Sequence, residues 1–188
     1  MEEFKMAFIQ ANYKDNERNN FDALPTGTYE ALIQTASEKI TPSGSESLQI
    51  RLLIRNDLDG VADLAGTNAK YHNRIVFMDN WKRKATNQYD TKSFQYILDA
   101  CQIPEGTSLE TIEDFIKAIT GKAVRVYIKK TQNTYQGETT DVNRVAPWNF
   151  DKTEYPQVQH KFKDGDLGID PFANDSEPID ISNEDLPF

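Results

Sequence analysis

The sequence has little of what catalysis and metal binding usually require. It holds one cysteine and two histidines in 188 residues. Cys101 falls on an apolar helix face without a base beside it, and zinc would need a cluster of cysteine and histidine. The acids Asp57, Asp59 and Asp79 are of the type that a metal-dependent nuclease uses, but loop acids are usually only solvated. We therefore expect no enzyme, no catalytic residues, no metal and no cofactor.

Long hydrophobic runs are also missing. No apolar stretch approaches the roughly 20 residues of a membrane span, and the first residues lack the basic and apolar regions of a signal peptide. One cysteine cannot form an internal disulfide, which agrees with a reducing compartment. We expect a cytoplasmic protein without membrane contact. A hydrophobic fraction of 38% over this length is enough for one core, so we expect one domain with appendages.

Positive charge is scarce overall, since the net charge is −9, but the charge is unevenly distributed. Residues 1–150 hold 18 Lys and Arg against 20 Asp and Glu, whereas residues 164–188 hold eight acids and neither Lys nor Arg. The chain is thus a nearly neutral body with an acidic tail, and clusters of bases in the body can still attract a polyanion.

Residues 27–56 predict a long β-hairpin. Tyr29, Ala31 and Ile33 alternate with polar residues, and the return run 47–55 alternates in the same way after the turn sequence TPSGSE. The polar side of the return strand carries Arg51 and Arg55. These arginines indicate either an ordinary solvated face or a surface for a polyanion, and the hairpin alone does not decide between them.

Residues 70–79 predict a third strand, and the consecutive apolar residues 75–78 indicate that both of its faces are covered. Trp81 and the triplet Lys82-Arg83-Lys84 follow directly. Aromatic residues among Lys and Arg are typical of single-strand binding, because nucleobases stack on the aromatic rings and phosphates pair with the positive charges. Lysines at a sheet edge also discourage aggregation, so both interpretations stay open here.

The second half of the chain predicts two helices and two further strands. Residues 91–102 and 108–120 have helical periodicity, and residues 122–130 alternate with Arg125, Tyr127 and Lys129 on the outer side. A turn bearing Tyr135 leads to a last strand that ends before Pro147. Five strands with helices between the third and fourth match a mainly β, five-stranded OB-fold barrel, or another small β-barrel with helices.

The order of short motifs from about Leu24 to Trp148 resembles one family. The motifs are LPTGTY, LLIRND, NRIVF, YILDAC, ITGKAVRVYI and TYQGETTDVNRV, and their order is similar to that of phage-encoded single-stranded DNA-binding proteins formerly classed as a domain of unknown function. The resemblance implies an OB barrel that coats single strands during phage DNA replication and recombination, in the host cytoplasm.

The last residues, SNEDLPF, resemble the acidic tails of bacterial and phage single-strand-binding proteins. The resemblance implies that replication and recombination enzymes dock on Asp185, Leu186, Pro187 and Phe188. Residues 170–172 form a fainter internal copy. A disordered acidic tail that only aids solubility fits the composition equally well.

We therefore predict an N-terminal arm (1–26), an OB-fold single-strand-binding domain (27–150) and a flexible acidic tail with a docking tip (151–188). The function we expect is sequence-tolerant binding of single-stranded DNA; the alternatives are an acidic adaptor that binds only proteins, and a recombination accessory that anneals strands. The sequence leaves homo-oligomer formation and RNA binding open. The predicted nucleic-acid contacts are Arg51, Arg55, Lys70, Tyr71, Arg74, Phe77, Trp81, Lys82, Arg83, Lys84, Arg125, Tyr127, Lys129 and Tyr135.

Overall fold

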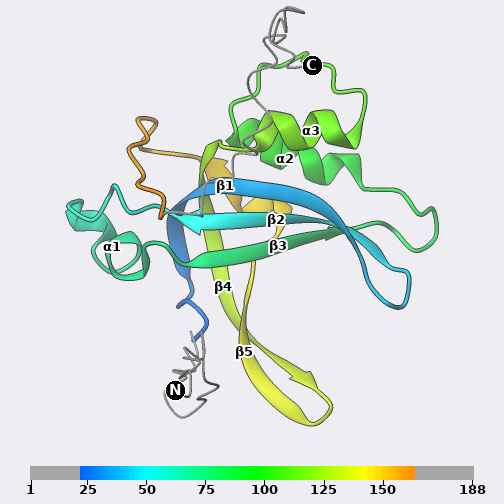
Figure 1. Cartoon of the computed structure of the whole chain (residues 1–188), viewed down its shortest axis with the longest axis horizontal. Coiled ribbons are helices and arrows are strands. Elements are labelled where there is room, and N and C mark those ends of the chain that lie inside the picture. Colours follow the sequence, from blue (N-terminus) through cyan, green and yellow to red (C-terminus); the bar gives the residue numbers. More distant parts are fainter. Residues whose placement is uncertain (1–21, 164–188) are drawn as a thin grey trace, which may run out of the picture.

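The computed structural model describes residues 22–163 (Figure 1). Most of the predicted N-terminal arm and all of the acidic tail from Asp164, with its docking residues 185–188, lie outside the described residues.

The described residues form one antiparallel sheet. Its strands are β1 (Gly27–Ile40), β2 (Glu46–Ile54), β3 (Ile75–Trp81), β4 (Ala123–Tyr135) and β5 (Glu138–Arg144), in the spatial order β3-β2-β1-β4-β5. A short β6 (Phe150–Lys152) pairs with β4 and was not predicted. The mainly β class is confirmed. The closed barrel is not formed, because within residues 22–163 no backbone ladder joins β3 to β5.

The helices lie where the sequence placed them, between β3 and β4. They are α2 (Thr91–Ala100) and α3 (Ile112–Ile119), which lie together at one end of the sheet (Figure 1). The Asp90 side chain caps α2 by accepting from the Lys92 N–H, and Thr111 with Asp114 forms a capping box on α3. Three shorter helices complete the structure: η1 (Ala62–Leu64), α1 (Asn68–Tyr71) and η2 (Pro147–Asn149).

The core lies between the sheet and the two helices. Leu48, Ile50, Leu52 and Ile54 of β2 are fully buried, as their alternation predicted. They belong to a cluster that includes inward residues of β4 and both helices, in which Phe94 of α2 stacks on Phe115 of α3 with ring centroids 4.4 Å apart. Burying each such side chain contributes about 1.5–3 kcal/mol.

A β-bulge divides β1 into two halves. The register with β2 shifts between Ile33 and Thr35, so Gln34 is an extra residue in the ladder. Because a shift of one residue exchanges the two faces of a strand, the residues beyond the bulge reverse their alternation. Ser37 and Lys39 therefore point away from the core, although Tyr29 and Ile33 point into it.

Residues 153–161, which we call the strap, cross the outer side of β1 and β2. The fully buried Arg55 donates to the Tyr155 and Gln157 carbonyls at 2.7 and 3.1 Å, and to Asp57 at 2.6 Å. The predicted flexible tail therefore does not begin at residue 151. Arg55 is not at the surface either, and we withdraw it as a nucleic-acid contact.

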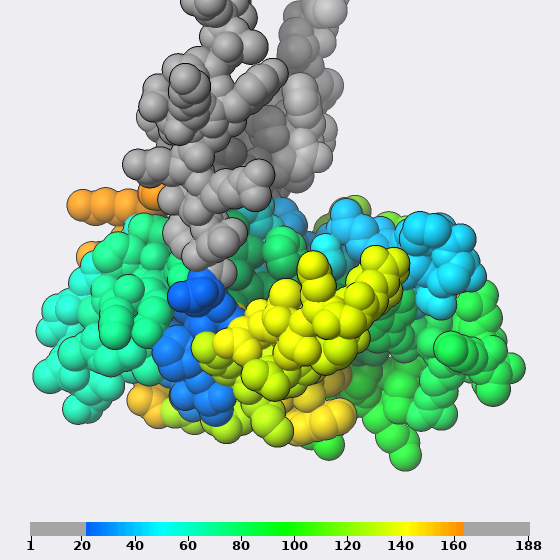
Figure 2. Space-filling view, turned by 90° about the horizontal axis from the view of Figure 1, so that it is seen from below, coloured from blue at the N-terminus to red at the C-terminus, as the bar shows by residue number. Residues whose placement is uncertain are grey.

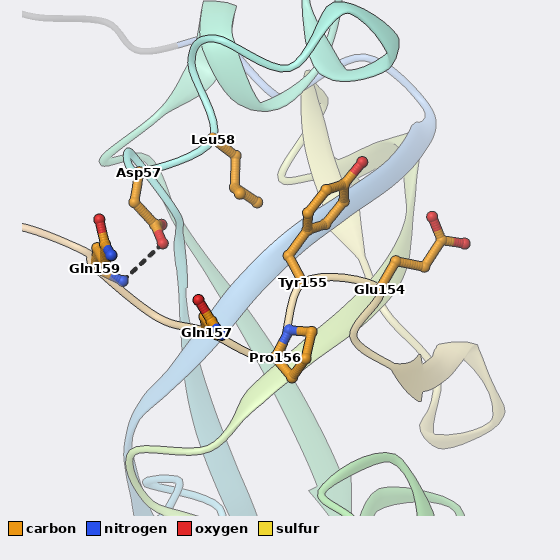
Figure 3. Close-up of a pocket in the computed structure, with 7 residues that line it drawn as sticks. All are labelled: Asp57, Leu58, Glu154, Tyr155, Pro156, Gln157 and Gln159. Atoms are coloured by element: carbon orange, nitrogen blue, oxygen red, sulfur yellow. Dashed lines mark hydrogen bonds between the residues drawn. The ribbon is translucent and has the colours of Figure 1, made fainter.

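The strap also encloses a second carboxylate and a small cavity. Burial raises the pKa of Glu30, which accepts from the Thr153 hydroxyl and from the Glu154 N–H. Figure 3 shows Leu58 and Tyr155 turned toward one another beside a cavity of about 360 Å³, where the Gln159 N–H donates to Asp57 at 2.8 Å. A buried polar network thus fixes the strap to the sheet.

The third strand is shorter than predicted, because residues 70–74 belong to α1 and the turn after it. From Ile75 the strand alternates strictly. Val76 and Met78 are buried, whereas Phe77 and Trp81 are 49% and 48% exposed. The prediction that both faces are covered is wrong, since the outer face of β3 is open.

Strands β4 and β5 extend well beyond the sheet as a hairpin, visible at the bottom of Figure 1. The predicted long turn is a tight one, in which Gln136 and Gly137 both have positive φ, as two-residue hairpin turns with the right twist require. Most residues of the projecting part, 129–141, are exposed. We call this part the arm, which is distinct from the predicted N-terminal arm. Figure 2 shows it in yellow as a ridge on the face seen from below.

Candidate nucleic-acid interface

One part of the sheet's outer side is left uncovered by the strap. It consists of residues 35–39 of β1, 47–51 of β2 and 77–81 of β3, and we call it the open face. Phe77 and Trp81 project from it with about half of each side chain exposed. They are four residue steps apart along an extended strand, a distance of about 13 Å. Exposed rings spaced along one strand form a platform on which successive bases can stack.

The register arranges the open face in three cross-strand rows. The first row joins Phe77 to Arg51 and Thr35, and the third joins Trp81 to Ser47 and Lys39. Each row with an aromatic residue therefore also carries one basic residue, Arg51 or Lys39. This pairing suits a ligand that has flat rings joined by phosphates. The middle row joins Asp79 to Gln49 and Ser37, as the same ladders show.

Two residues of the open face were missed by the prediction. Lys39 lies an even number of residues after Tyr29 and Ile33, which point into the core. In a strand without the bulge at Gln34, Lys39 would therefore point to the core side as well. Asp79 is the last residue of the predicted strand 70–79 and is treated there as a loop acid, whereas β3 continues to Trp81. The alternation of residues 75–81 is visible only in their burial, because their sequence begins with four consecutive apolar residues, and nothing local to β1 reveals the bulge.

The basic triplet after Trp81 does not act as one patch. Lys82 points to the opposite side from Trp81, where its ammonium pairs with Glu46 and lies 3.8 Å from Glu38. The hydrogen bond to Glu46 raises the pKa of Lys82. Arg83 pairs with Asp90 at 2.5 Å, and Lys84 is exposed. Of the three, Lys82 is therefore occupied by structural contacts.

Arg125 and Tyr127 lie on a different outer surface, beside β1 rather than β3. Arg125 pairs with Glu154 and lies 3.8 Å from Asp151. A cavity of about 400 Å³ there is lined by Tyr127 and by acids that include Asp63. Because acids surround these two residues, this surface disfavours phosphate, and the structure does not bring them to the open face.

The remaining predicted contacts near β3 serve packing or line a groove. Tyr71 is partly buried and meets Tyr29 edge to face at 6.3 Å, with the Lys70 ammonium 5.4 Å from its ring centroid. Arg74 donates to the Asp22 carbonyl at 2.5 Å. Arg74 and Phe77 line a groove of about 490 Å³ between β3 and β5. The groove thus continues from one edge of the open face.

The arm carries the last two predicted contacts. Lys129 is exposed near its base, and Tyr135 is 71% exposed beside the turn. Lys130 pairs with Asp141 across the two strands at 2.9 Å. The arm is therefore polar on both sides with one aromatic residue at its tip, and no residue of the described core covers it.

Residues 22–163 contain no group of three or more His, Cys, Asp or Glu placed to hold a metal ion. Cys101 is buried, and burial raises the pKa of its thiol to about 12. His72 is paired with Asp59 at 2.9 Å. In the same part of the chain, no helix has the length and apolar character needed to cross a membrane.

Fold and site together define a mainly β protein with an open antiparallel sheet and an exposed aromatic face. The chain belongs to the family described as "Protein of unknown function (DUF669)", whose model matches residues 11–168. No curated protein matches it. Among solved structures, "Yeast RPA bound to ssDNA" aligns with 79% of this chain and 92% of its own, at 9% identity and a TM-score of 0.33. A likeness this weak does not assign the fold.

Proposed function

We propose that this protein binds single-stranded DNA on the open face. The nucleobases stack on the exposed rings, and binding shows no strong sequence selection. The observation that carries the proposal is the pair Phe77 and Trp81, half exposed on one face of β3 with Arg51 and Lys39 in the same rows. Stacking contributes about 1–3 kcal/mol per base and accepts any base, because every base has a π-face.

The strand order supports an OB-type fold as the basis of this site. An order β3-β2-β1-β4-β5 with helices between β3 and β4 fits the partly open Greek-key barrel of the OB-fold. In that fold the face of strands 2 and 3 and the loops 1–2 and 4–5 bind oligonucleotides. The open face lies on those two strands, and Tyr135 lies at the hairpin between β4 and β5.

A titration of labelled oligo-dT followed by fluorescence anisotropy tests the proposal. We expect the double substitution Phe77→Ala with Trp81→Ala to weaken binding at least about 30-fold, from the loss of two stacked bases. The matched control is Tyr96→Ala with Trp148→Ala, which removes two aromatics elsewhere that are at least as exposed, at 51% and 67%. The control should bind normally.

Equal losses in both double variants would contradict the open face as the site. If the unaltered protein does not bind oligo-dT at low salt, the single-strand proposal fails as a whole. The alternative of an acidic adaptor that binds only proteins would then remain. Strand annealing by the bound protein, measured with complementary labelled strands, would distinguish the accessory role from simple coating.

We further propose that the protein coats strands in phage DNA replication and recombination and has no catalytic activity of its own. The acidic residues 164–188 would compete with DNA for the body's bases at low salt, and residues 185–188 would recruit partner enzymes. Removing Phe188 alone should abolish capture of replication enzymes and leave DNA affinity unchanged, since it removes an apolar anchor and no side-chain charge. Capture that survives this deletion would reduce the tail to a solubility device.

A further inference from the structure

We infer that the open face also discriminates between bases, with Asp79 favouring cytosine over thymine by accepting a hydrogen bond from the cytosine amino group. This inference rests on the proposed function, because it concerns which bases the same face prefers. Stacking on Phe77 and Trp81 tolerates every base, so selection by hydrogen bonding needs a polar group near the two rings.

Asp79 is that group. It is exposed and lies midway between the two rings on the same face of β3, about 6.7 Å along the strand from each. A base stacked on either ring can therefore turn its polar edge toward the carboxylate. No other acid projects from the open face: of residues 35–39, 47–51 and 77–81, nine point outward, and Asp79 is the one acid among those nine.

The carboxylate is held in one orientation. Gln49 Nε2 donates to Asp79 Oδ1 at 3.1 Å, and the hydroxyl of the buried Ser47 lies 3.5 Å from the same oxygen. Among residues 22–163, Oδ2 accepts no hydrogen bond. The side chain is thus fixed through one oxygen and offers the other to a ligand.

The chemistry of a carboxylate decides what that ligand group is. An ionised carboxylate only accepts hydrogen bonds, and it repels phosphate. Phosphates are therefore directed to the basic residues Arg51 and Lys39 in the outer rows. The edges of the nucleobases are directed to the middle row. Cytosine presents an N4 amino donor at the position where thymine presents the O4 acceptor. The cytosine amino group forms a charge-assisted hydrogen bond with Oδ2. The thymine O4 is an acceptor like Oδ2, so the two oxygens repel each other.

The test compares oligo-dC with oligo-dT of equal length in mildly alkaline buffer, where cytosine stays unprotonated. We expect the unaltered protein to bind oligo-dC roughly tenfold more tightly, the effect of one hydrogen bond to a charged group. In Asp79→Asn the preference should disappear or reverse, because the amide NH2 takes the place of Oδ2, where it donates to thymine O4 and repels the cytosine amino group. The amide keeps an acceptor for Gln49, so the melting temperature should not change.

The control is Asp99→Asn, which removes an exposed acid of α2 that pairs with Lys152, away from the open face. It should leave the preference for oligo-dC intact. Equal binding of both oligonucleotides by the unaltered protein would overturn this inference and leave the proposed function standing. A preference that survives Asp79→Asn would also overturn it. Failure to bind either oligonucleotide would instead overturn the proposed function.

Discussion

Arg55 shows how far a single residue can depart from its local pattern. It follows Arg51 on the polar side of β2, and the alternation places both at the surface. Arg55 is instead fully buried, because a strap about 100 residues later in the chain supplies two carbonyls for its guanidinium. The pattern of one strand contains no information about a segment so distant, so the sequence could not predict this burial.

The partner carboxylate of Arg55 gives a testable consequence. We expect Asp57→Asn to lower the free energy of unfolding at neutral pH by about 3 kcal/mol, because the buried Arg55 loses its close counter-ion at 2.6 Å and keeps only Glu30 at 4.0 Å. Burial alone would raise the pKa of Asp57, but hydrogen bonds from Arg55 and the Gln159 N–H outweigh it and hold the pKa below its usual value. Denaturant titrations of both proteins over a pH series measure the difference.

The pH dependence of that difference follows from the sign of the shift. A lowered pKa stabilises the folded state above the unfolded value of about 3.9, and this stability disappears as the pH falls through the folded value. The gap between the two proteins should therefore close in acid. Asp59→Asn is the control, since Asp59 is 43% exposed and its pairing with His72 is worth less than about 1 kcal/mol. Equal effects of both substitutions would contradict the buried pair.

At the scale of elements, most boundaries and faces followed from hydrophobic periodicity. The strands β1, β2 and β4 and the two main helices occur where the sequence predicted them, because each has one buried face with a clear repeat. Two features that shape the open face escaped. The bulge at Gln34 leaves no local signature, and the start of β3 was obscured by the bases and aromatics of α1. Both errors changed the predicted site more than the predicted fold.

The bulge turns Lys39 to the same face as Arg51, so we predict that these two basic residues contact phosphate. We expect Lys39→Ala with Arg51→Ala to lower the salt dependence of single-strand binding, as the slope of log K against log salt, by about 1.4, or 0.7 per contact. Lys152→Ala is the control, because Lys152 is 58% exposed on β6 and pairs with Asp99. Binding titrations at several salt concentrations give both slopes. An unchanged slope in the double variant would remove these two residues from the interface.

At the scale of the whole molecule, the mainly β class and the helical insertion could be predicted, but the site only in part. Arg51, Phe77 and Trp81 meet on the open face, whereas Arg125 and Tyr127 face acids and Lys82 faces Glu46. A sheet that curls has several outer surfaces, and the sequence shows which residues point outward but not which outer surfaces coincide. The proposed site is therefore one surface, and the exposed Lys and Arg residues elsewhere are not part of it.

The two tryptophans of the chain test that surface directly. Trp81 lies on the open face, and Trp148 is exposed in η2, outside it. Trp148→Phe leaves Trp81 as the only tryptophan, and Trp81→Phe leaves Trp148. When oligo-dT is added to saturation, we predict strong quenching of tryptophan emission in Trp148→Phe, because a thymine stacks on the Trp81 ring, and little change in Trp81→Phe. Quenching confined to Trp148, or binding without quenching of Trp81, would contradict the assignment of the open face as the single-strand-binding site.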